Sequence, residues 1–447
     1  MTLLWISLAI FFTFIMFQSF YILVPLFKNE ERRRSLVTKK HRFSVLVPAY
    51  NEEKVLYQCI VGFRQSNYQN AELLIINDGS TDGTMKYLEE LLGLQECKRP
   101  KQQNLQHMMI RGMYHSSKYD DIFVIDKVNG GKADSLNAGI NYSDGDIVIT
   151  LDADSILDPQ AIGEMNREFQ PDEVAACGGN VLIAQAFQGD LRNMEPTFQV
   201  KPIVGYQLLQ YLIDFYLYKR AQASLGTMTV ISGAFGAFRR HVLGEIGGFR
   251  KTIGEDMDIT LKLHLWLKEG GNKNRISFVP TAKCYTECPD TLNSMFKQRV
   301  RWQKAFIDCL FHYKKFYFHK FTKRFSFFFL CDQFLIGTLN AFPVLATPVL
   351  LLLNPGSLEV VLALGLSAVT LFLYQSVIML YIAKEHGIAF YGWDLAKVVL
   401  FLFSGMLVYR MINQCFVIYG TVSFFHQKDA WNKFERRGEI ALGRVES

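Results

Sequence analysis

The sequence lacks the cysteine patterns of zinc-binding and disulfide-rich proteins. Its 447 residues include eight cysteines, but no CxxC pair and no Cys/His set at zinc spacing. Cys284 and Cys288 are close enough in sequence to permit a disulfide or a metal site. We expect reduced thiols instead, as in a domain that faces the cytosol.

A broad basic face is also missing. The formal net charge is only +6 at pH 7, and the basic residues occur in clusters. This distribution argues against a nucleic-acid-binding protein and fits charges that flank membrane segments. We therefore expect no nucleic-acid partner and a lipid bilayer as one partner of the chain.

Charge is absent from residues 3–27, a stretch long enough to cross a bilayer. It lacks the basic start and the small-residue cleavage site of a signal peptide, so we predict that residues 1–27 form a retained transmembrane helix. Three more spans are predicted within residues 326–425, at about 326–353, 358–383 and 396–425. The last contains Arg410, Asn413 and Gln414, which favour a polar path or a protein-lined cavity over contact with lipid.

The charges beside the first span predict the topology. Residues 28–42 form a basic linker with seven Lys or Arg residues against two Glu residues, so this side of the membrane is predicted to be cytoplasmic. Four spans would place both termini outside, and the charge of the tail, residues 426–447, is too balanced to test this. We expect a multi-pass protein of the plasma or inner membrane whose soluble domain is cytoplasmic.

Residues 43–290 have a different pattern, in which short apolar runs alternate with helix-like segments. We predict buried strands at residues 43–48, 73–76, 122–125 and 147–151. Strands that alternate with helices indicate an α/β domain with a Rossmann-like sheet, mixed but mostly parallel. The site of such a domain lies at the carboxyl ends of its strands.

Two further stretches are expected to be helical. Residues 200–225 are rich in Tyr and Leu and suit either the membrane surface or packing within the domain. Residues 291–325 mix aromatic with basic side chains and run directly into an apolar span. We interpret them as cytoplasmic interfacial helices rather than as a nucleic-acid site.

Two carboxylates follow the predicted strand at residues 147–151. Alternate residues of a strand point the same way, so Asp152 and Asp154 would reach one small volume beyond its end. Their charges repel, and a divalent cation with oxygen ligands relieves the conflict, although a solvated turn is also compatible with the sequence. Asp78, which follows the strand at residues 73–76, is delivered to the same sheet edge and supports a site there.

Glycine-rich segments before helices suit the binding of phosphate. Residues 77–82 contain Gly79, and residues 129–139 place Gly130 and Gly131 directly before Lys132. Free N–H groups at a helix start attract anions, glycine permits close backbone approach and lysine supplies a point charge. Each segment alone is equally explained by loop and helix-cap chemistry.

The motifs together resemble those of membrane-embedded processive family 2 glycosyltransferases, the group of cellulose, chitin, hyaluronan and poly-N-acetylglucosamine synthases. They run in order from Val47 to Trp302 and end in a Gln-x-x-Arg-Trp motif at residues 298–302, which makes the set more specific than any one member. Two positions depart from the family pattern. Asn77 replaces an Asp, and Gly254 replaces a Thr, which we expect to loosen the loop before Glu255.

The resemblance implies a GT-A-like catalytic domain (residues 43–290), interfacial helices (291–325) and a set of site residues. Asp256 is implied as the general base that acts on the acceptor hydroxyl, with Glu255 beside it. Asp154, with Asp152, is implied to hold Mg²⁺ or Mn²⁺ on the diphosphate. Trp302 is implied to stack the acceptor sugar, while a membrane-interface anchor is the alternative from composition. The implied nucleotide and diphosphate set is Ala49, Asn51, Glu52, Asp78, which would contact uracil, Lys132, Gln298 and Arg301.

The resemblance further implies an inverting enzyme that uses a UDP-sugar, UDP-GlcNAc or UDP-glucose, to extend a β-linked extracellular polysaccharide. The layout is most similar to that of the poly-N-acetylglucosamine synthases that make biofilm exopolysaccharide, and the growing polymer would be exported. It leaves room for a small accessory membrane subunit. The alternatives are a non-processive enzyme that adds one sugar to a lipid acceptor, and a membrane receptor or scaffold that keeps the fold without turnover.

Overall fold

A computed structural model describes residues 2–27, 37–271, 273–346 and 358–426. Most of the predicted basic linker and nearly all of the C-terminal tail lie outside these residues. All eight cysteines lie within them and are free, Cys284 and Cys288 included.

The four predicted strands form the centre of one sheet. They are β1 (Phe43–Ala49), β2 (Ala71–Asn77), β5 (Ile122–Lys127) and β6 (Ile147–Leu151). Each pairs in parallel with its neighbour in the order β5-β2-β1-β6, and every residue of β2 and β6 is buried. Continuous apolar runs are typical of parallel strands covered on both faces, and the carboxyl ends of all four reach one edge.

The remaining strands make the sheet mixed. The full order is β3-β4-β5-β2-β1-β6-β11-β8-β12-β7, in which β4, β11 and β7 run antiparallel to a neighbour and β12 runs parallel to β8. Their bounds are β3 (Leu94–Glu96), β4 (Ile110–Ser116), β7 (Ser155–Leu157), β8 (Val174–Ile183), β11 (Phe235–Arg239) and β12 (Arg275–Thr286), with a separate pair β9 (Phe187–Gln188) and β10 (Glu195–Pro196). The predicted mixed, mostly parallel sheet is confirmed.

Several of the helices between β1 and β12 pack directly on this sheet. They are α2 (Leu56–Arg64), α3 (Thr84–Leu92), α4 (Lys132–Tyr142), α5 (Ala161–Glu168), α8 (Arg240–Glu245) and α9 (Glu255–Glu269). A side chain at Gly139 of α4 would meet Leu46 and Ile76, so glycine lets α4 lie close over β1 and β2. This packing places the start of α4 at the carboxyl edge of the central strands.

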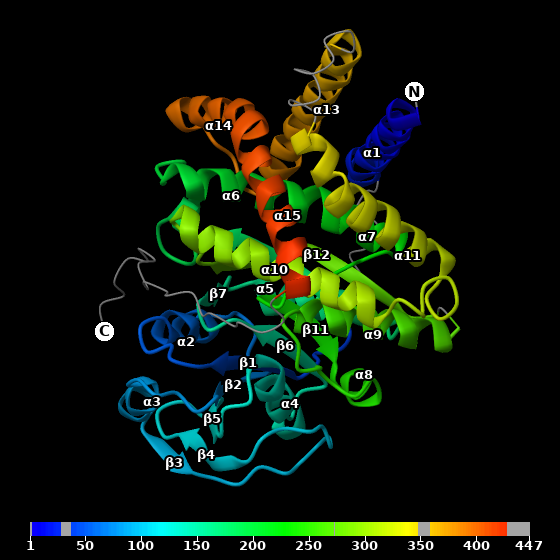
Figure 1. Cartoon of the computed structure of the whole chain (residues 1–447). Coiled ribbons are helices and arrows are strands. Elements are labelled where there is room, and N and C mark those ends of the chain that lie inside the picture. Colours follow the sequence, from blue (N-terminus) through cyan, green and yellow to red (C-terminus); the bar gives the residue numbers. More distant parts are fainter. Residues whose placement is uncertain (1, 28–36, 272, 347–357, 427–447) are drawn as a thin grey trace.

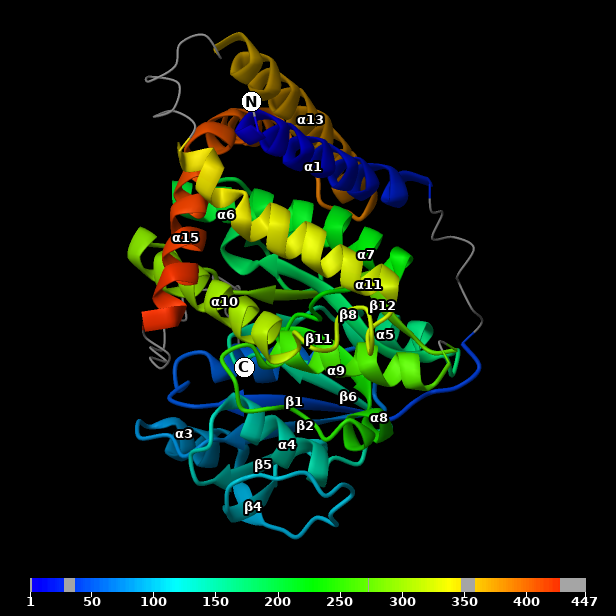
Figure 2. The same ribbon diagram turned by 45° about the vertical axis from the view of Figure 1, so that its right-hand side comes forward.

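A second layer of helices lies between the sheet and the helices α1 (Thr2–Phe27) and α13 (Leu358–Glu385) (Figures 1 and 2). It contains α6 (Pro202–Ile213), the π-helical turn η3 (Asp214–Tyr218), α7 (Lys219–Leu225), α10 (Leu292–His312), α11 (Lys323–Phe328) and the π-helical segment η4 (Phe329–Leu339). The predicted interfacial segment is therefore helical where it carries residues 298–302. Its helix α10 begins after Thr291, whose side chain accepts a hydrogen bond from the Ser294 N–H, a normal N-cap.

The apolar helices only partly match the four predicted spans. Among the residues that the structure describes, segments Lys323–Ala346 and Gly365–Glu385 are long and apolar enough to cross a membrane, and Phe11–Phe27 is a shorter apolar helix. They belong to α1 (Thr2–Phe27), the α11–η4 segment and α13 (Leu358–Glu385). Figures 1 and 2 show α1 and α13 at the end of the molecule opposite β3 and β4.

The region of the predicted span at residues 396–425 is helical but changes direction, and its crossing of the membrane stays a prediction. That region contains α14 (Gly392–Ser404), the π-helical turn η6 (Gly405–Tyr409) and α15 (Arg410–His426). In Figure 1 α15 descends steeply from α14 and crosses α10, and the side-chain amide of Gln303 on α10 donates to Thr421 on α15. The guanidinium of Arg410 lies 4.5 Å from the ring centre of Phe372 on α13, a contact with protein, as expected for a polar group in an apolar region.

Candidate active site

Charged side chains from three separate parts of the chain meet at the carboxyl edge of the sheet. The ammonium of Lys132, at the start of α4, lies 2.7 Å from Asp152 Oδ1 and 3.2 Å from Glu255 Oε1. It also donates to the Gly233 carbonyl at 3.4 Å. Three of the predicted site residues are thus in direct contact, although more than a hundred positions separate Lys132 from Glu255 in sequence.

The ionisation of this cluster follows from burial and mutual attraction. Burial disfavours the charge of Lys132, but the carboxylates of Asp152 and Glu255 outweigh it and raise the pKa of Lys132 above its ordinary value. Burial raises the pKa of Glu255, which Lys132 opposes and Asp256 reinforces. The same side chain is influenced by Arg301, so α10 contributes a second cation to the cluster.

Asp256 lies next to the cluster, across Gly233. A β-carbon at Gly233 would stand 3.0 Å from Lys132 Nζ and 3.4 Å from Asp256 Cβ, so glycine allows the backbone to pass between these two groups. The Asp256 carboxylate accepts a hydrogen bond from the Met257 N–H at 2.8 Å. This contact orients the carboxylate at the first turn of α9, where a negative charge is favourable.

Asp152 directly follows β6, and Asp154 lies in the turn between β6 and β7 and not on an extended strand. Asp154 is buried, and its Oδ1 accepts from Thr286 at 3.3 Å. Among the described residues no group of three or more His, Cys, Asp or Glu side chains is arranged to hold a metal by itself. Two carboxylates beside an anionic substrate do suit Mg²⁺ or Mn²⁺, because these ions commonly complete their coordination with substrate phosphate and water.

The charge balance of the cluster also fits a divalent cation. Asp152, Glu255 and Asp256 surround Lys132 and Arg301, and Asp154 lies near Asp152, so carboxylates outnumber cations here even when Lys219 is included. An incoming diphosphate would be repelled by that excess. A divalent cation held by Asp152 and Asp154 would cancel it.

Asp78 holds the glycine loop in front of α4. Its carboxylate accepts from Gly130 N at 2.9 Å and Gly131 N at 2.8 Å, and it pairs with Lys127 Nζ at 2.5 Å. Gly131 has φ +94°, a conformation that glycine adopts without strain. Asp78 therefore fixes the loop that positions Lys132, and its predicted contact with uracil stays a prediction.

Lys127 is a site residue that the sequence analysis missed. Its side chain is completely buried and is neutralised by Asp78 and by Asp134 Oδ1, 2.6 Å away. Burial of a charged lysine without such partners would lower the stability of the fold. The signal that could have revealed it is the charged pair Asp126-Lys127 at the end of an otherwise apolar strand.

Replacing Asp78 by Asn is expected to destabilise the protein by about 3 kcal/mol, because it leaves Lys127 buried with one carboxylate fewer. The measurement is the thermal unfolding of the full chain in detergent. The matched control is Glu90→Gln, which breaks the exposed 3.9 Å ion pair of Lys86 with Glu90 and should cost less than about 1 kcal/mol. Equal melting temperatures for Asp78→Asn and the control would contradict the structural role of Asp78.

The loop after β1 is tied to the loop after β2. Asn51 has φ +55°, and its side-chain oxygen accepts from the Thr81 N–H at 2.8 Å. The Ala49 carbonyl accepts from the Asp78 N–H at 2.8 Å, and Glu52 is buried. Ala49, Asn51, Glu52 and Asp78 thus form one connected edge, as their predicted common role in nucleotide binding requires.

Both departures from the family pattern have a physical explanation. The Asn77 amide donates to Asp126 Oδ1 at 2.7 Å, where an Asp at position 77 would face another carboxylate. A β-carbon at Gly254 would come within 2.6 Å of the Ala305 β-carbon on α10. The expectation that Gly254 loosens its loop is therefore wrong, because Gly254 permits tight packing of the α9 start against α10.

Helix α10 carries the remaining predicted residues. Arg301 acts on Glu255, as described above, and Trp302 is 39% exposed. The side-chain oxygen of Gln298 is buried without a hydrogen-bond partner among the described residues. Since Ala305 touches the start of α9, the segment with Trp302 lies close to Asp256.

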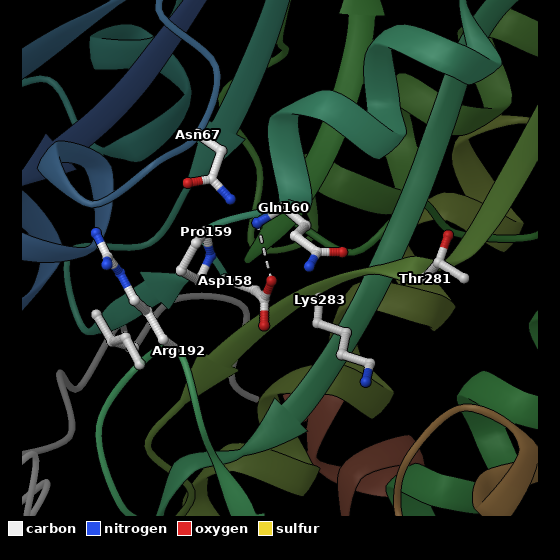
Figure 3. A pocket seen from close by; sticks show the side chains of 8 residues that line it. Asn67, Asp158, Pro159, Gln160, Arg192, Thr281 and Lys283 are labelled. Carbon is white, nitrogen blue, oxygen red and sulfur yellow. Dashed lines mark hydrogen bonds between the residues drawn. The ribbon is translucent and has the colours of Figure 1, made fainter.

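A separate cavity of about 430 Å³ lies beyond β7 (Figure 3). Asp158 lies between Arg192 and Lys283 in this view and accepts from the Gln160 N–H at 2.9 Å. None of the predicted site residues lines this cavity, and Lys283 donates to the His386 carbonyl in the α13–α14 loop at 2.7 Å. The cavity is lined mainly by residues of β12, of the β9–β10 turn and of the segment after β7, and it is separate from the charged cluster.

Known proteins with similar sequences were found among polysaccharide synthases. The chain is 30% identical over 303 residues to the poly-beta-1,6-N-acetyl-D-glucosamine synthase of Staphylococcus aureus (strain COL), over 67% of this chain and 62% of that protein. It is 29% identical over 286 residues to the synthase of the same name from Staphylococcus epidermidis, over 62% of this chain and 59% of that protein. The chain thus spans about three-fifths of the length of these relatives.

A solved structure with a similar fold and two protein-family models also match this chain. The mannosyltransferase PcManGT from Pyrobaculum calidifontis, solved with GDP-Man and Mn²⁺, has a similar fold, with a TM-score of 0.56 at 16% identity over 94% of this chain and 96% of that one. The model of glycosyl transferase family 2 matches residues 44–247. That of glycosyl transferase family group 2 matches residues 147–413, more than half of the chain. The chain therefore belongs to glycosyl transferase family 2.

Proposed function

We propose that this chain is an inverting membrane glycosyltransferase that uses a UDP-sugar, UDP-N-acetylglucosamine or UDP-glucose, to extend a β-linked, poly-N-acetylglucosamine-like extracellular polysaccharide and to couple its synthesis to export. The observation that carries the proposal is the cluster in which Lys132 contacts Asp152 and Glu255 beside Asp256. The 30% identity to poly-beta-1,6-N-acetyl-D-glucosamine synthase supports a polymer of N-acetylglucosamine as the product.

On the donor side, the departing diphosphate gains negative charge as its bond to the sugar breaks. Lys132 and Arg301 are the cations that stabilise this charge, and Lys132 exchanges part of its contact with Asp152 and Glu255 for phosphate oxygens. Mg²⁺ or Mn²⁺, held by Asp154 and Asp152, would supply further neutralisation of the diphosphate when bound. The edge formed by Ala49, Asn51, Glu52 and Asp78, with Gln298, holds the nucleotide.

On the acceptor side, Asp256 is the general base. It takes the proton of the acceptor hydroxyl while the hydroxyl oxygen attacks the anomeric carbon and the bond to the diphosphate breaks. Attack from the face opposite the leaving group inverts the anomeric centre. The exposed indole of Trp302 stacks on the acceptor sugar. This contact fixes the orientation of the sugar ring.

The proposed location is the cell membrane, with the catalytic domain in the cytoplasm. The apolar segments Lys323–Ala346 and Gly365–Glu385 support membrane insertion. The growing polysaccharide and the bilayer are then the partners of the chain, together with a small accessory membrane subunit. Four spans and an external position of both termini stay part of this proposal.

The reconstituted full chain is expected to convert radiolabelled UDP-N-acetylglucosamine into a long polymer when Mg²⁺ or Mn²⁺ is present. The measurement is gel electrophoresis of the product followed by digestion with hydrolases of known linkage, with UDP-glucose and GDP-mannose as competing donors. A single labelled sugar on lipid would instead identify a non-processive enzyme. Tight UDP binding without turnover of any donor would identify a receptor or scaffold.

A further inference from the structure

Arg299 lies inside the motif at residues 298–302, at a position that the Gln-x-x-Arg-Trp pattern leaves open. Its side chain is buried, with 9% of the residue exposed, although it carries a full charge. Its guanidinium carbon lies 4.3 Å from the centre of the Trp302 ring. Residues three apart on a helix are neighbours, so this stack is built into the sequence of α10.

The Arg299 guanidinium is only partly hydrogen-bonded, through a contact with Tyr409 in η6. Within the part of the chain that the structure describes, its Nε and Nη2 atoms have no hydrogen-bond partner. Asp214 and Tyr211 on the α6–η3 helix, Cys288 after β12 and Tyr409 in η6 all lie within electrostatic reach of Arg299. Burial raises the pKa of Asp214 to about 6, and Arg299 opposes this shift. The hydrogen bond with Tyr409 anchors the guanidinium, and its flat face lies against the indole of Trp302.

A stacked guanidinium changes what the indole can bind. An aromatic ring has two faces, and Arg299 covers one of the two faces of Trp302. The 39% of Trp302 that is exposed must then belong to its other face and its edge. A flat, delocalised guanidinium suits this contact, whereas the compact ammonium of a lysine does not cover a ring in the same way.

We propose that Arg299 is a positioning residue of the acceptor site, which holds the indole of Trp302 from one face so that the acceptor saccharide can stack only on the other face. The inference rests on the proposed function and adds a determinant of acceptor binding to it. A platform with one usable face presents the terminal sugar to Asp256 in one orientation. A free indole would turn and release the growing chain sooner.

The test compares two variants of the full chain. Arg299→Lys keeps the positive charge opposite Asp214 but removes the flat face, and Arg299→Met removes both. Lys297→Met is the matched control, because it removes an exposed cation from the same helix. Each is assayed for donor KM, for mean product length and for the KM of an added N-acetylglucosamine oligosaccharide acceptor.

Arg299→Lys is expected to raise the acceptor KM by about tenfold and to shorten the product, with an unchanged donor KM. Its melting temperature should match that of the unmodified chain, whereas Arg299→Met is expected to melt earlier because Asp214 loses the larger of its two countercharges, Arg299 and Lys219. Product of normal length from Arg299→Lys would overturn the proposal, since charge alone would then suffice. Absence of polymer from the unmodified chain would instead refute the proposed function.

Discussion

Replacing Asp256 by Asn is expected to lower the rate of sugar transfer by about 10²–10⁴-fold, the usual contribution of a general base. The amide keeps the shape of the side chain and can still interact with the Met257 N–H, but it cannot take a proton from the acceptor hydroxyl. The nucleotide edge at Ala49 and Asp78 and the cation Lys132 are untouched. The affinity for UDP, measured by calorimetry in the presence of Mg²⁺, should therefore change by less than about threefold.

The matched control for this variant is Asp120→Asn. Asp120 is an exposed carboxylate before β5, at the edge of the sheet opposite the site, so its loss should leave transfer and UDP affinity unchanged. Loss of UDP binding together with transfer in Asp256→Asn would show that Asp256 belongs to the donor site. Glu255, which already contacts Lys132, would then become the candidate base.

The central strands of the sheet could be predicted because the apolar residues that indicate each strand lie within one short stretch of the sequence. The strands β1, β2, β5 and β6 are apolar on both faces, so each appears in the sequence as an uninterrupted run. The region at residues 396–425 has the composition of a membrane span, but composition does not reveal the π-helical turn at Gly405–Tyr409, where α14 gives way to α15. Packing against α10 decides the course of α15, and packing is not a local property.

The candidate site was predictable in its residue types and less so in its contacts. The resemblance indicated Lys132, Asp152 and Glu255, but their mutual ion pairs depend on the closure of the sheet edge. The pair of Asp78 with Lys127 joins the loop after β2 to the end of β5, and no local pattern indicates it. Gly254 was misjudged because its role depends on one distance, to Ala305 on another helix.

The ion pairs of Lys132 have a consequence for donor binding. In the absence of a substrate, this lysine is already neutralised by Asp152 and Glu255, and it cannot by itself offset the charge of a diphosphate. Lys219 is a further cation within electrostatic reach of Asp256. Its attraction to the Asp214 carboxylate is stronger than its attraction to Asp256. We therefore expect the excess of carboxylates around Lys132 to oppose the binding of UDP and to make donor affinity depend on a divalent cation.

Removal of divalent cations with EDTA is expected to lower the affinity for UDP at least about tenfold, or about 1.4 kcal/mol, and to reduce sugar transfer to background. In Asp154→Asn the same treatment should have a much smaller effect, because one negative charge and one ligand oxygen of the proposed cation site are removed together. UDP affinity is measured by calorimetry with Mg²⁺, with Mn²⁺ and with K⁺ at equal ionic strength, which separates binding of the cation from simple screening. Asp158→Asn is the matched control, since Asp158 lies in the separate cavity beyond β7.

UDP affinity that is the same with K⁺ as with Mg²⁺ would refute a cation site at Asp152 and Asp154, and Lys132 and Arg301 would then have to neutralise the diphosphate alone.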